Sequence, residues 1–154
     1  MPDASPISLP AGPPYPDVRS VIPHREPFLF IDRVVELSER RVVATRLFRG
    51  DEAFFRGHFP QRAVVPGVLL IEGLAQTMAY FALCQQPKGQ VFLVGVDRAR
   101  FRSIVEPDQE VTFEVEIGEQ RFGMLTGRGR AKRGTVRVAD ASITGYSGDA
   151  VPAL

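Results

Sequence analysis

Two side chains that can exchange protons lie close together in the sequence. His58 stands in a Gly-His-Phe-Pro segment, and Glu72 is the only charged residue between positions 63 and 87. Apolar surroundings disfavour the charged form of a carboxyl group, so such a glutamate can keep its proton and act as a general acid. An imidazole can serve as the matching base. The alternative is structural: Glu72 could pair with an arginine such as Arg62, and His58 could be an ordinary loop residue.

A third candidate is the backbone of Gly67, in the sequence Pro66-Gly67-Val68. Proline suits the start of a helix, and the first amides of a helix have no partner within it. These amides also lie at the positive end of the helix dipole, so they could bind a carbonyl oxygen on which negative charge develops. Taken alone, Gly67 is equally well explained as a simple helix-start glycine.

The element that would position Gly67 and Glu72 is an apolar stretch ending at Pro87. Its apolar residues fall on every face of a helical projection, which is typical of a helix buried on all sides. We predict a helix over residues 67–84. Glu72 in mid-span, with the polar Gln76 and Thr77, favours a buried helix of a globular domain over a membrane span.

The remaining patterns predict strands. Val111, Phe113, Val115 and Ile117 alternate with polar residues, which is the period of a sheet with one solvated face. In residues 135–144 the apolar positions change parity, which predicts a bulge. The predicted strands are 28–37, 42–49, 91–102, 110–119, 124–132 and 135–144.

Strands without intervening helices favour antiparallel pairing, and an apolar helix requires burial on several sides. We therefore predict an α+β domain in which a curved antiparallel sheet wraps around a long central helix. A single small sheet cannot enclose such a helix, so we expect dimerisation to complete the fold. The predicted division is a proline-rich arm at residues 1–17, one domain at 18–146 and a tail at 147–154.

Composition limits the function classes. The net charge is +1, which gives no support to nucleic acid or an anionic membrane as partner. A single cysteine and two histidines offer no cluster resembling a structural zinc site, so we expect no metal. The first residues are rich in proline and do not resemble a secretory signal, which favours a cytoplasmic location.

Four motifs, in this order and spacing, resemble the bacterial FabZ-type 3-hydroxyacyl-[acyl-carrier-protein] dehydratases. The similarity runs from about residue 18 to residue 145, outside the arm and the tail. The motifs are Pro-His-Arg-Glu-Pro-Phe-Leu at 23–29, Gly-His-Phe-Pro at 57–60, Pro-Gly-Val-Leu-Leu-Ile-Glu-Gly-Leu-Ala-Gln at 66–76 and Val-Asp-Arg-Ala-Arg-Phe at 96–101.

The resemblance implies the hotdog fold and dehydration of a (3R)-hydroxyacyl thioester, carried by acyl carrier protein, to the trans-2-enoyl thioester. It implies that His58 removes the proton next to the thioester carbonyl, that Glu72 protonates the departing hydroxyl, and that the Gly67 amide binds the carbonyl oxygen. No cofactor is implied. The family builds its sites at the interface of a homodimer, with the glutamate facing the histidine of the other subunit. A dimer and a hexamer of three dimers both remain open.

Two further features have structural and functional interpretations. His24 lies in a family-like motif, but its place beside Pro23 and Arg25 favours a role in loop structure. Arg98, Arg100 and Arg102 share one parity of a strand, and Arg128, Arg130 and Lys132 share one parity of another. If these strands are neighbours they form a basic stripe. It is either a solvated sheet face or a docking surface for an acidic carrier protein.

The sequence departs from the family at Glu106-Pro107-Asp108, where members often have Pro-Gly-Asp. Glutamate rather than aspartate at position 72 favours a dehydratase over the related dehydratase/isomerase. The rival hypotheses are a hotdog acyl thioesterase and a non-catalytic acyl-binding subunit. Acyl chain length, the choice between carrier protein and coenzyme A, and the pathway are left open.

Overall fold

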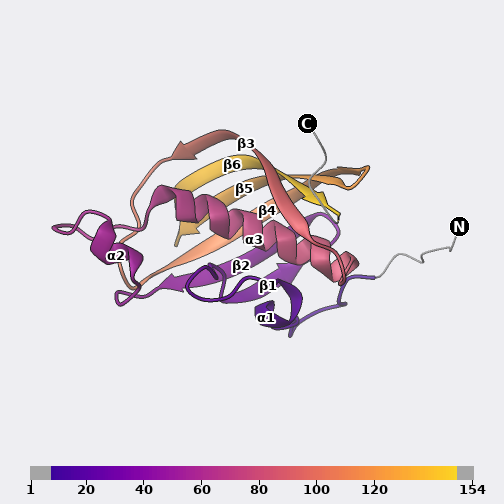
Figure 1. Cartoon of the computed structure of the whole chain (residues 1–154), viewed down its shortest axis with the longest axis horizontal. Helices are drawn as coiled ribbons and strands as arrows, with labels where there is room; N and C mark the ends of the chain where they lie inside the picture. The colour runs from indigo at the N-terminus through magenta and orange to yellow at the C-terminus, as the bar shows by residue number, and fades with distance from the viewer. Residues whose placement is uncertain (1–7, 149–154) are drawn as a thin grey trace, which may run out of the picture.

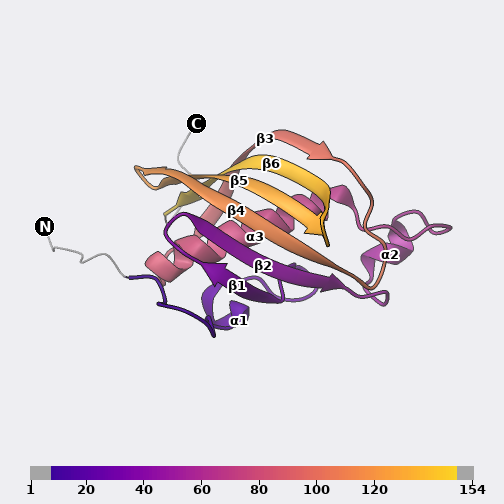
Figure 2. The same ribbon diagram turned by 180° about the vertical axis from the view of Figure 1, so that it is seen from behind.

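A computed structural model describes residues 8–148 of the chain. Within these residues one sheet curves around one long helix, α3, which lies across a single face of the sheet (Figures 1 and 2). The elements in chain order are α1 (Val18–Val21), β1 (Arg33–Leu37), β2 (Arg41–Phe48), α2 (Phe54–Gly57), α3 (Gly67–Gln85), β3 (Val91–Phe101), β4 (Gln109–Arg121), β5 (Met124–Arg133) and β6 (Val136–Ser147).

The sheet has six antiparallel strands in the order β1-β2-β4-β5-β6-β3. Its edges are therefore β1 and β3. The alternation predicted for residues 110–119 is confirmed, because Val111, Phe113 and Val115 of β4 are fully buried against α3 while Glu116 is exposed. The predicted α+β architecture of a curved antiparallel sheet around a central helix is thus confirmed.

Helix α3 follows the predicted span of 67–84 to within one residue. Proline at position 66 caps its start, and the residues from Leu70 to Leu83 are almost all buried. By length and composition α3 could cross a membrane, since its most apolar 18-residue stretch has a mean hydropathy of 1.5. However, 67% of this stretch is buried within the molecule. Its apolar character is therefore accounted for by its place in the core.

Glycines let α3 lie close to the sheet. A Cβ atom at Gly73 would stand 2.3 Å from the ring of Phe113 on β4, and one at Gly129 of β5 would stand 2.9 Å from the side chain of Leu74. Neither distance is compatible with an added methyl group in a close-packed interior. The helix axis, and with it the position of Glu72, is thus set by contacts that only glycine permits.

Two strand predictions have informative outcomes. The strand predicted at 28–37 begins only at Arg33, because the backbone N–H of Phe30 donates to the side chain of Gln76 on α3 rather than to a neighbouring strand. The bulge predicted in 135–144 is confirmed: Ala131 pairs with Ala139 and Lys132 with Arg137, so that one residue of β6 is left over. The two short helices, α1 and α2, were not predicted.

The segment before α1 contacts α3 where it is described. Leu9 and Tyr15 pack against the core, and the hydroxyl of Tyr80 donates to the carbonyl of Pro16 at 2.7 Å. Residues 1–7 of the predicted arm and residues 149–154 of the predicted tail lie outside the described residues. The division into 1–17, 18–146 and 147–154 stays a prediction.

Candidate functional site

His58 is the residue that ends α2, and one of its ring nitrogens is fixed by the backbone. Its Nδ1 lies 3.0 Å from the carbonyl oxygen of Val64. A carbonyl can only accept, so this contact requires a proton on Nδ1, and in a neutral ring the lone pair then lies on Nε2. The ring also packs against Phe59, with centroids 4.3 Å apart. The contact thus selects, for the neutral ring, the tautomer that a base acting through Nε2 requires.

The carbonyl of Val64 is itself held in place by the next residue. The N–H of Val65 donates to the carbonyl of Val105 at 2.8 Å, which ties the approach to α3 to the loop between β3 and β4. Phe59 adopts a positive φ of 53°. Such a conformation is costly for a bulky residue and persists only where its surroundings hold it. The loop around His58 is accordingly shaped by specific contacts rather than by local preference.

Glu72 lies on α3 with its carboxylate held by Gln76. The Gln76 side-chain nitrogen donates to Glu72 Oε1 at 3.0 Å, and also to the carbonyl of Phe28 at 3.0 Å. Its oxygen accepts the N–H of Phe30 at 2.8 Å. All the hydrogen-bonding groups of this fully buried amide except one lone pair are used. The amide therefore fixes Glu72 and the segment 28–30 together.

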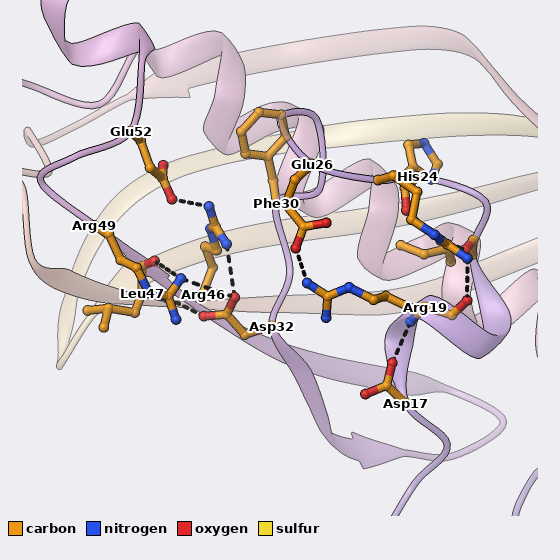
Figure 3. Close-up of polar contacts among 12 residues, drawn as sticks. Asp17, Arg19, His24, Glu26, Phe30, Asp32, Arg46, Leu47, Arg49 and Glu52 are labelled. Atoms are coloured by element: carbon orange, nitrogen blue, oxygen red, sulfur yellow. Dashed lines mark hydrogen bonds and ion pairs between the residues drawn. The ribbon is translucent and has the colours of Figure 1, made fainter.

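His24 lies beside Glu72, with its Nε2 3.7 Å from Glu72 Oε1. Burial lowers the pKa of His24, while the nearby Glu72 carboxylate raises it and Arg25 lowers it. Figure 3 shows His24 on the loop above Arg19. The sequence argument favoured a loop role for His24 and did not foresee its place next to Glu72. Nothing in the local pattern indicated this contact, because it joins residues that are far apart in the chain.

The arginine proposed as the alternative partner of Glu72 lies elsewhere. Arg62 is mostly exposed and its guanidinium approaches Glu106, at 3.9 Å. Among the described residues, the one basic side chain within 4.0 Å of the Glu72 carboxylate is His24. The structural explanation of Glu72 as half of an arginine ion pair is therefore wrong.

Gly67 is the first residue of α3, where the helix meets the end of β3. A Cβ atom at this position would stand 2.8 Å from the ring of Phe101. The absence of a side chain is thus needed for the packing of α3 against β3. The N–H of Leu69 donates to the carbonyl of Pro66 at 2.9 Å. The N–H groups of Gly67 and Val68 precede it at the start of the helix, where backbone amides have no partner within the helix.

Glu72 lines one cavity of the chain, and residues that follow His58 line another. The cavity beside the His58 loop is lined by Phe59, Pro60, Gln61, Arg62, Val64 and Ile104. The cavity at Glu72 is lined by His24, Gln76 and, from β3, Val91, Phe92 and Leu93, among others. The two linings share no residue. Glu72 and the loop that follows His58 thus line separate cavities of one chain.

The predicted basic stripe forms only in part: Arg100 of β3 and Arg130 of β5 both lie opposite Asp140 of β6, whereas Arg98, with a φ of 53°, lies in an irregularity of β3. Strand β6 lies between β3 and β5, and its Asp140 pairs with Arg102 at 2.5 Å. Arg102 lowers the pKa of Asp140 through this hydrogen bond, against the smaller opposing effect of burial. On the β4 side, Lys132 pairs with Glu114 and Arg130 approaches Glu116. Much of the stripe is thus a solvated face of alternating charge.

Metal ligands do not gather in the part of the chain that is described: no group of three or more His, Cys, Asp or Glu side chains there could hold an ion. The single cysteine, Cys84, is half-buried, and burial raises the pKa of its thiol. Neither observation supplies another reactive centre.

Comparison with known proteins identifies close relatives. A family model described as FabA-like domain matches residues 22–142. The 3-hydroxyacyl-[acyl-carrier-protein] dehydratase FabZ of Staphylococcus carnosus is 49% identical over 121 residues, 77% of this chain and 82% of the relative. The FabZ of Caldanaerobacter subterraneus subsp. tengcongensis is 38% identical over 130 residues, 82% of this chain and 92% of the relative.

Solved structures share the fold at low sequence identity. The dehydratase heterocomplex ApeI:P from Xenorhabdus doucetiae superposes with a TM-score of 0.77 at 15% identity, covering 88% of this chain and 93% of that one. A mutant of thioesterase PA1618 from Pseudomonas aeruginosa gives a TM-score of 0.59 at 13% identity, covering 75% and 80%. These likenesses concern the fold alone, and the hotdog fold predicted from the sequence is confirmed.

Proposed function

Since this chain belongs to the FabA-like family, among the FabZ 3-hydroxyacyl-[acyl-carrier-protein] dehydratases, we propose that it dehydrates a (3R)-3-hydroxyacyl thioester to the trans-2-enoyl thioester. The C2–H bond breaks, its electron pair forms the C2–C3 double bond, and the C3 hydroxyl leaves with a proton as water. The observation that carries this proposal within the molecule is the contact of His58 Nδ1 with the Val64 carbonyl, at 3.0 Å.

In this mechanism His58 is the base. With its Nδ1 proton committed to the Val64 carbonyl, the Nε2 lone pair is free to take the proton from C2 of the substrate. Negative charge then develops on the thioester oxygen, and the Gly67 amide at the start of α3 is the proposed donor that stabilises it. General base catalysis and a pre-positioned donor are together the devices expected for an enolate-like transition state.

Glu72 is the proposed acid that delivers a proton to the departing 3-hydroxyl. The amide of Gln76 donates to one carboxylate oxygen, Oε1, at 3.0 Å. This contact fixes the orientation of the carboxyl group and leaves its other oxygen, Oε2, to carry the proton that the departing hydroxyl takes up. After the reaction His58 releases its proton to solvent and Glu72 takes one up from solvent. The site thus returns to its starting state without a cofactor.

The active site is proposed to form between two copies of this chain. Strand β3 is an edge strand, and Leu93, Val96 and Phe101 on it are exposed. Unpaired strand edges favour pairing with another strand. Antiparallel pairing of β3 with its copy around a two-fold axis would place the start of one β3 beside the end of the other. Residues 91–93 line the Glu72 cavity, and Ile104 just beyond β3 lines the His58 cavity. The dimer would therefore join His58 of one copy to Glu72 of the other.

The proposed substrate carrier is acyl carrier protein, after the names of the relatives. Arg98 and Arg100 lie on β3 close to this interface, and neither has an ion-pair partner within 4.0 Å among the described residues. They are the part of the stripe that could meet an acidic partner. Binding through them should weaken as salt concentration rises. The cytoplasmic location inferred from the sequence stays a prediction.

The experiment that tests the shared site combines two inactive variants. His58→Ala and Glu72→Gln are each assayed by the absorbance change of crotonyl thioester hydration, and are then unfolded together and refolded as a mixture. Half of the dimers should be mixed, and each mixed dimer has one intact site of two, so about one quarter of the wild-type activity should return. A site contained within one chain would give no recovery.

The same preparations separate the dehydratase from the rival thioesterase. Hydration removes the absorbance of the enoyl thioester and leaves the thioester bond intact, whereas a thioesterase releases a free thiol that a thiol reagent detects. Thiol release without hydration by the wild-type protein, on either carrier protein or coenzyme A thioesters, would overturn the proposed function. A folded wild-type protein inert in both assays would favour the acyl-binding subunit instead.

A further inference from the structure

We propose that Arg46 is a positioning residue for both halves of the active site, an inference that rests on the proposed function. Its guanidinium joins Asp32 to Glu52 (Figure 3). Asp32 follows the segment 28–30, which is hydrogen-bonded to the Gln76 side chain that holds Glu72. Glu52 lies just before α2, the helix that ends at His58. Arg46 touches neither catalytic candidate, so its effect would be exerted through these segments.

Arg46 is a charged residue that the fold buries. It lies on β2, and only 9% of its side chain is exposed. One terminal nitrogen donates to Asp32 Oδ1 at 2.9 Å, and the other donates to Glu52 Oε1. The guanidinium also lies over the ring of Phe48, 5.6 Å from its centroid. A buried charge is tolerated when it is paired and hydrogen-bonded, as both terminal nitrogens are here, while Nε has no partner among the described residues.

The first route runs from Glu52 to His58. The carbonyl of Glu52 accepts the N–H of Phe55 at 3.2 Å, in the first turn of α2, and α2 ends directly before His58. Burial raises the pKa of the Glu52 carboxyl, and the charge of Arg46 opposes this effect. Among the described residues, Oε2 of Glu52 has no hydrogen-bond partner. Arg46 is the side chain that donates a hydrogen bond to this carboxylate, beside a contribution from the Arg49 backbone and charge, and through the carboxylate it acts on the start of α2.

The second route runs from Asp32 to Glu72. Asp32 is bound to β2 three times: its N–H donates to the Thr45 carbonyl, its Oδ2 accepts the N–H of Leu47, each at 2.7 Å, and its Oδ1 accepts from Arg46. Two residues earlier, the N–H of Phe30 donates to Gln76, the residue that holds the Glu72 carboxylate. A shift of Asp32 would move this segment and the amide attached to it.

The guanidinium group suits this function because it is planar and presents several N–H donors in fixed directions. An ammonium group on a lysine is a compact charge on a flexible stem, and its three rotatable donors lack this fixed planar geometry. Arg46→Lys therefore keeps the charge while removing the fixed direction of the two hydrogen bonds. Glu52→Gln keeps an acceptor for Arg46 and removes the charge on the side of α2.

A matched pair on the outer face of the sheet provides the control. Arg130 and Glu116 are the same residue types on neighbouring strands, 3.7 Å apart and far more exposed. We would compare Arg46→Lys and Glu52→Gln with Arg130→Lys and Glu116→Gln. All four, with the wild type, would be checked by solution mass and by melting, and then assayed for kcat and KM in hydration of crotonyl thioester.

A second measurement does not depend on activity. The chain has only two histidines, so the ring nitrogen NMR signals of His58 can be assigned by comparison with a His24→Gln protein. These signals report the tautomer and the hydrogen bond to Val64. A residue that merely stabilises the fold would leave them unchanged in the folded variants.

The expected result is that kcat falls at least about tenfold in Arg46→Lys and Glu52→Gln with KM little changed, because misplacing a catalytic group affects the chemical step. The His58 ring signals should shift in these two variants and stay in place in the controls. If wild-type kcat and unshifted signals persist in both variants, the inference is overturned. A wild-type protein without dehydratase activity would instead overturn the proposed function, and the NMR comparison would still decide whether Arg46 positions His58.

Discussion

Replacing Gln76 by methionine should destabilise the fold, although an apolar side chain would be expected to fit well among the apolar residues that surround Gln76 on a core helix. Methionine has a similar length and is well tolerated in apolar interiors. The substitution would nevertheless remove the side-chain amide to which the N–H of Phe30 and the carbonyl of Phe28 are hydrogen-bonded. Glu72 would lose its donor as well.

The magnitude follows from the groups left behind. An unsatisfied buried polar group costs about 1–3 kcal/mol, and water can reach the more exposed Phe28 more easily than the buried Phe30. We expect a loss of about 2–4 kcal/mol in the free energy of unfolding, a large part of the 5–15 kcal/mol that is typical of a domain. The fixation of Glu72 should be lost too, so kcat should fall in the protein that remains folded.

The assay is urea unfolding at one fixed protein concentration, since dimerisation would make stability depend on concentration. The control is Thr77→Val, one residue further along α3. The Thr77 hydroxyl is equally buried, but it donates to the carbonyl of Gly73, which is also an acceptor within the helix. Its removal should cost no more than about 1 kcal/mol. Equal small losses in both variants would refute the argument that Gln76 binds the segment 28–30 to the helix.

Three further predictions concern stability and assembly. Burial lowers the pKa of His24 from its ordinary 6.5, so the unfolded chain binds the proton first as pH falls. The free energy of unfolding should therefore decrease as pH drops from 6.5 towards the folded-state pKa. In a pH series of urea unfolding, His24→Gln should flatten this part of the curve, and an unchanged slope would contradict the prediction. Gly73→Ala places a methyl group 2.3 Å from the Phe113 ring and should cost about 1–3 kcal/mol, which Phe113→Leu in the same chain should partly restore in the same measurement. Val96→Lys on the edge strand β3 should give a folded monomer without activity by solution mass and assay, whereas a dimer of unchanged mass would place the interface elsewhere.

The sequence predicted the elements that local pattern controls. The apolar run bounded by Pro66 and Pro87 gave α3 almost to the residue, and strict alternation identified β4. The change of parity in β6 correctly indicated its bulge. These features succeed because periodicity and proline act within a few residues. The strand predicted at 28–37 was too long because its first part is bound by Gln76, a contact over 46 residues that no local pattern contains.

For the candidate site, residue types were predictable and their neighbours were not. His58 stood out as a proton acceptor and Glu72 as a proton donor near an apolar helix, and those roles stay predictions. The part played by Gln76 could have been found, because it lies four residues after Glu72 and so shares its helix face. His24 and Arg46 could not, since their contacts with Glu72, Asp32 and Glu52 depend on the path of loops between distant elements.

The separation of His58 from Glu72 has a cause in how α3 is packed. Gly73 packs against Phe113 and Gly67 against Phe101, so these two contacts hold α3 close to the sheet. Glu72 therefore faces the start of β3, while the His58 loop lies near its end. The proposed antiparallel pairing of β3 with its copy would bring the two ends of β3 together and so complete the proposed site. In that dimer, stability of the interface and catalysis would depend on the same strand, so variants of β3 should lose both together.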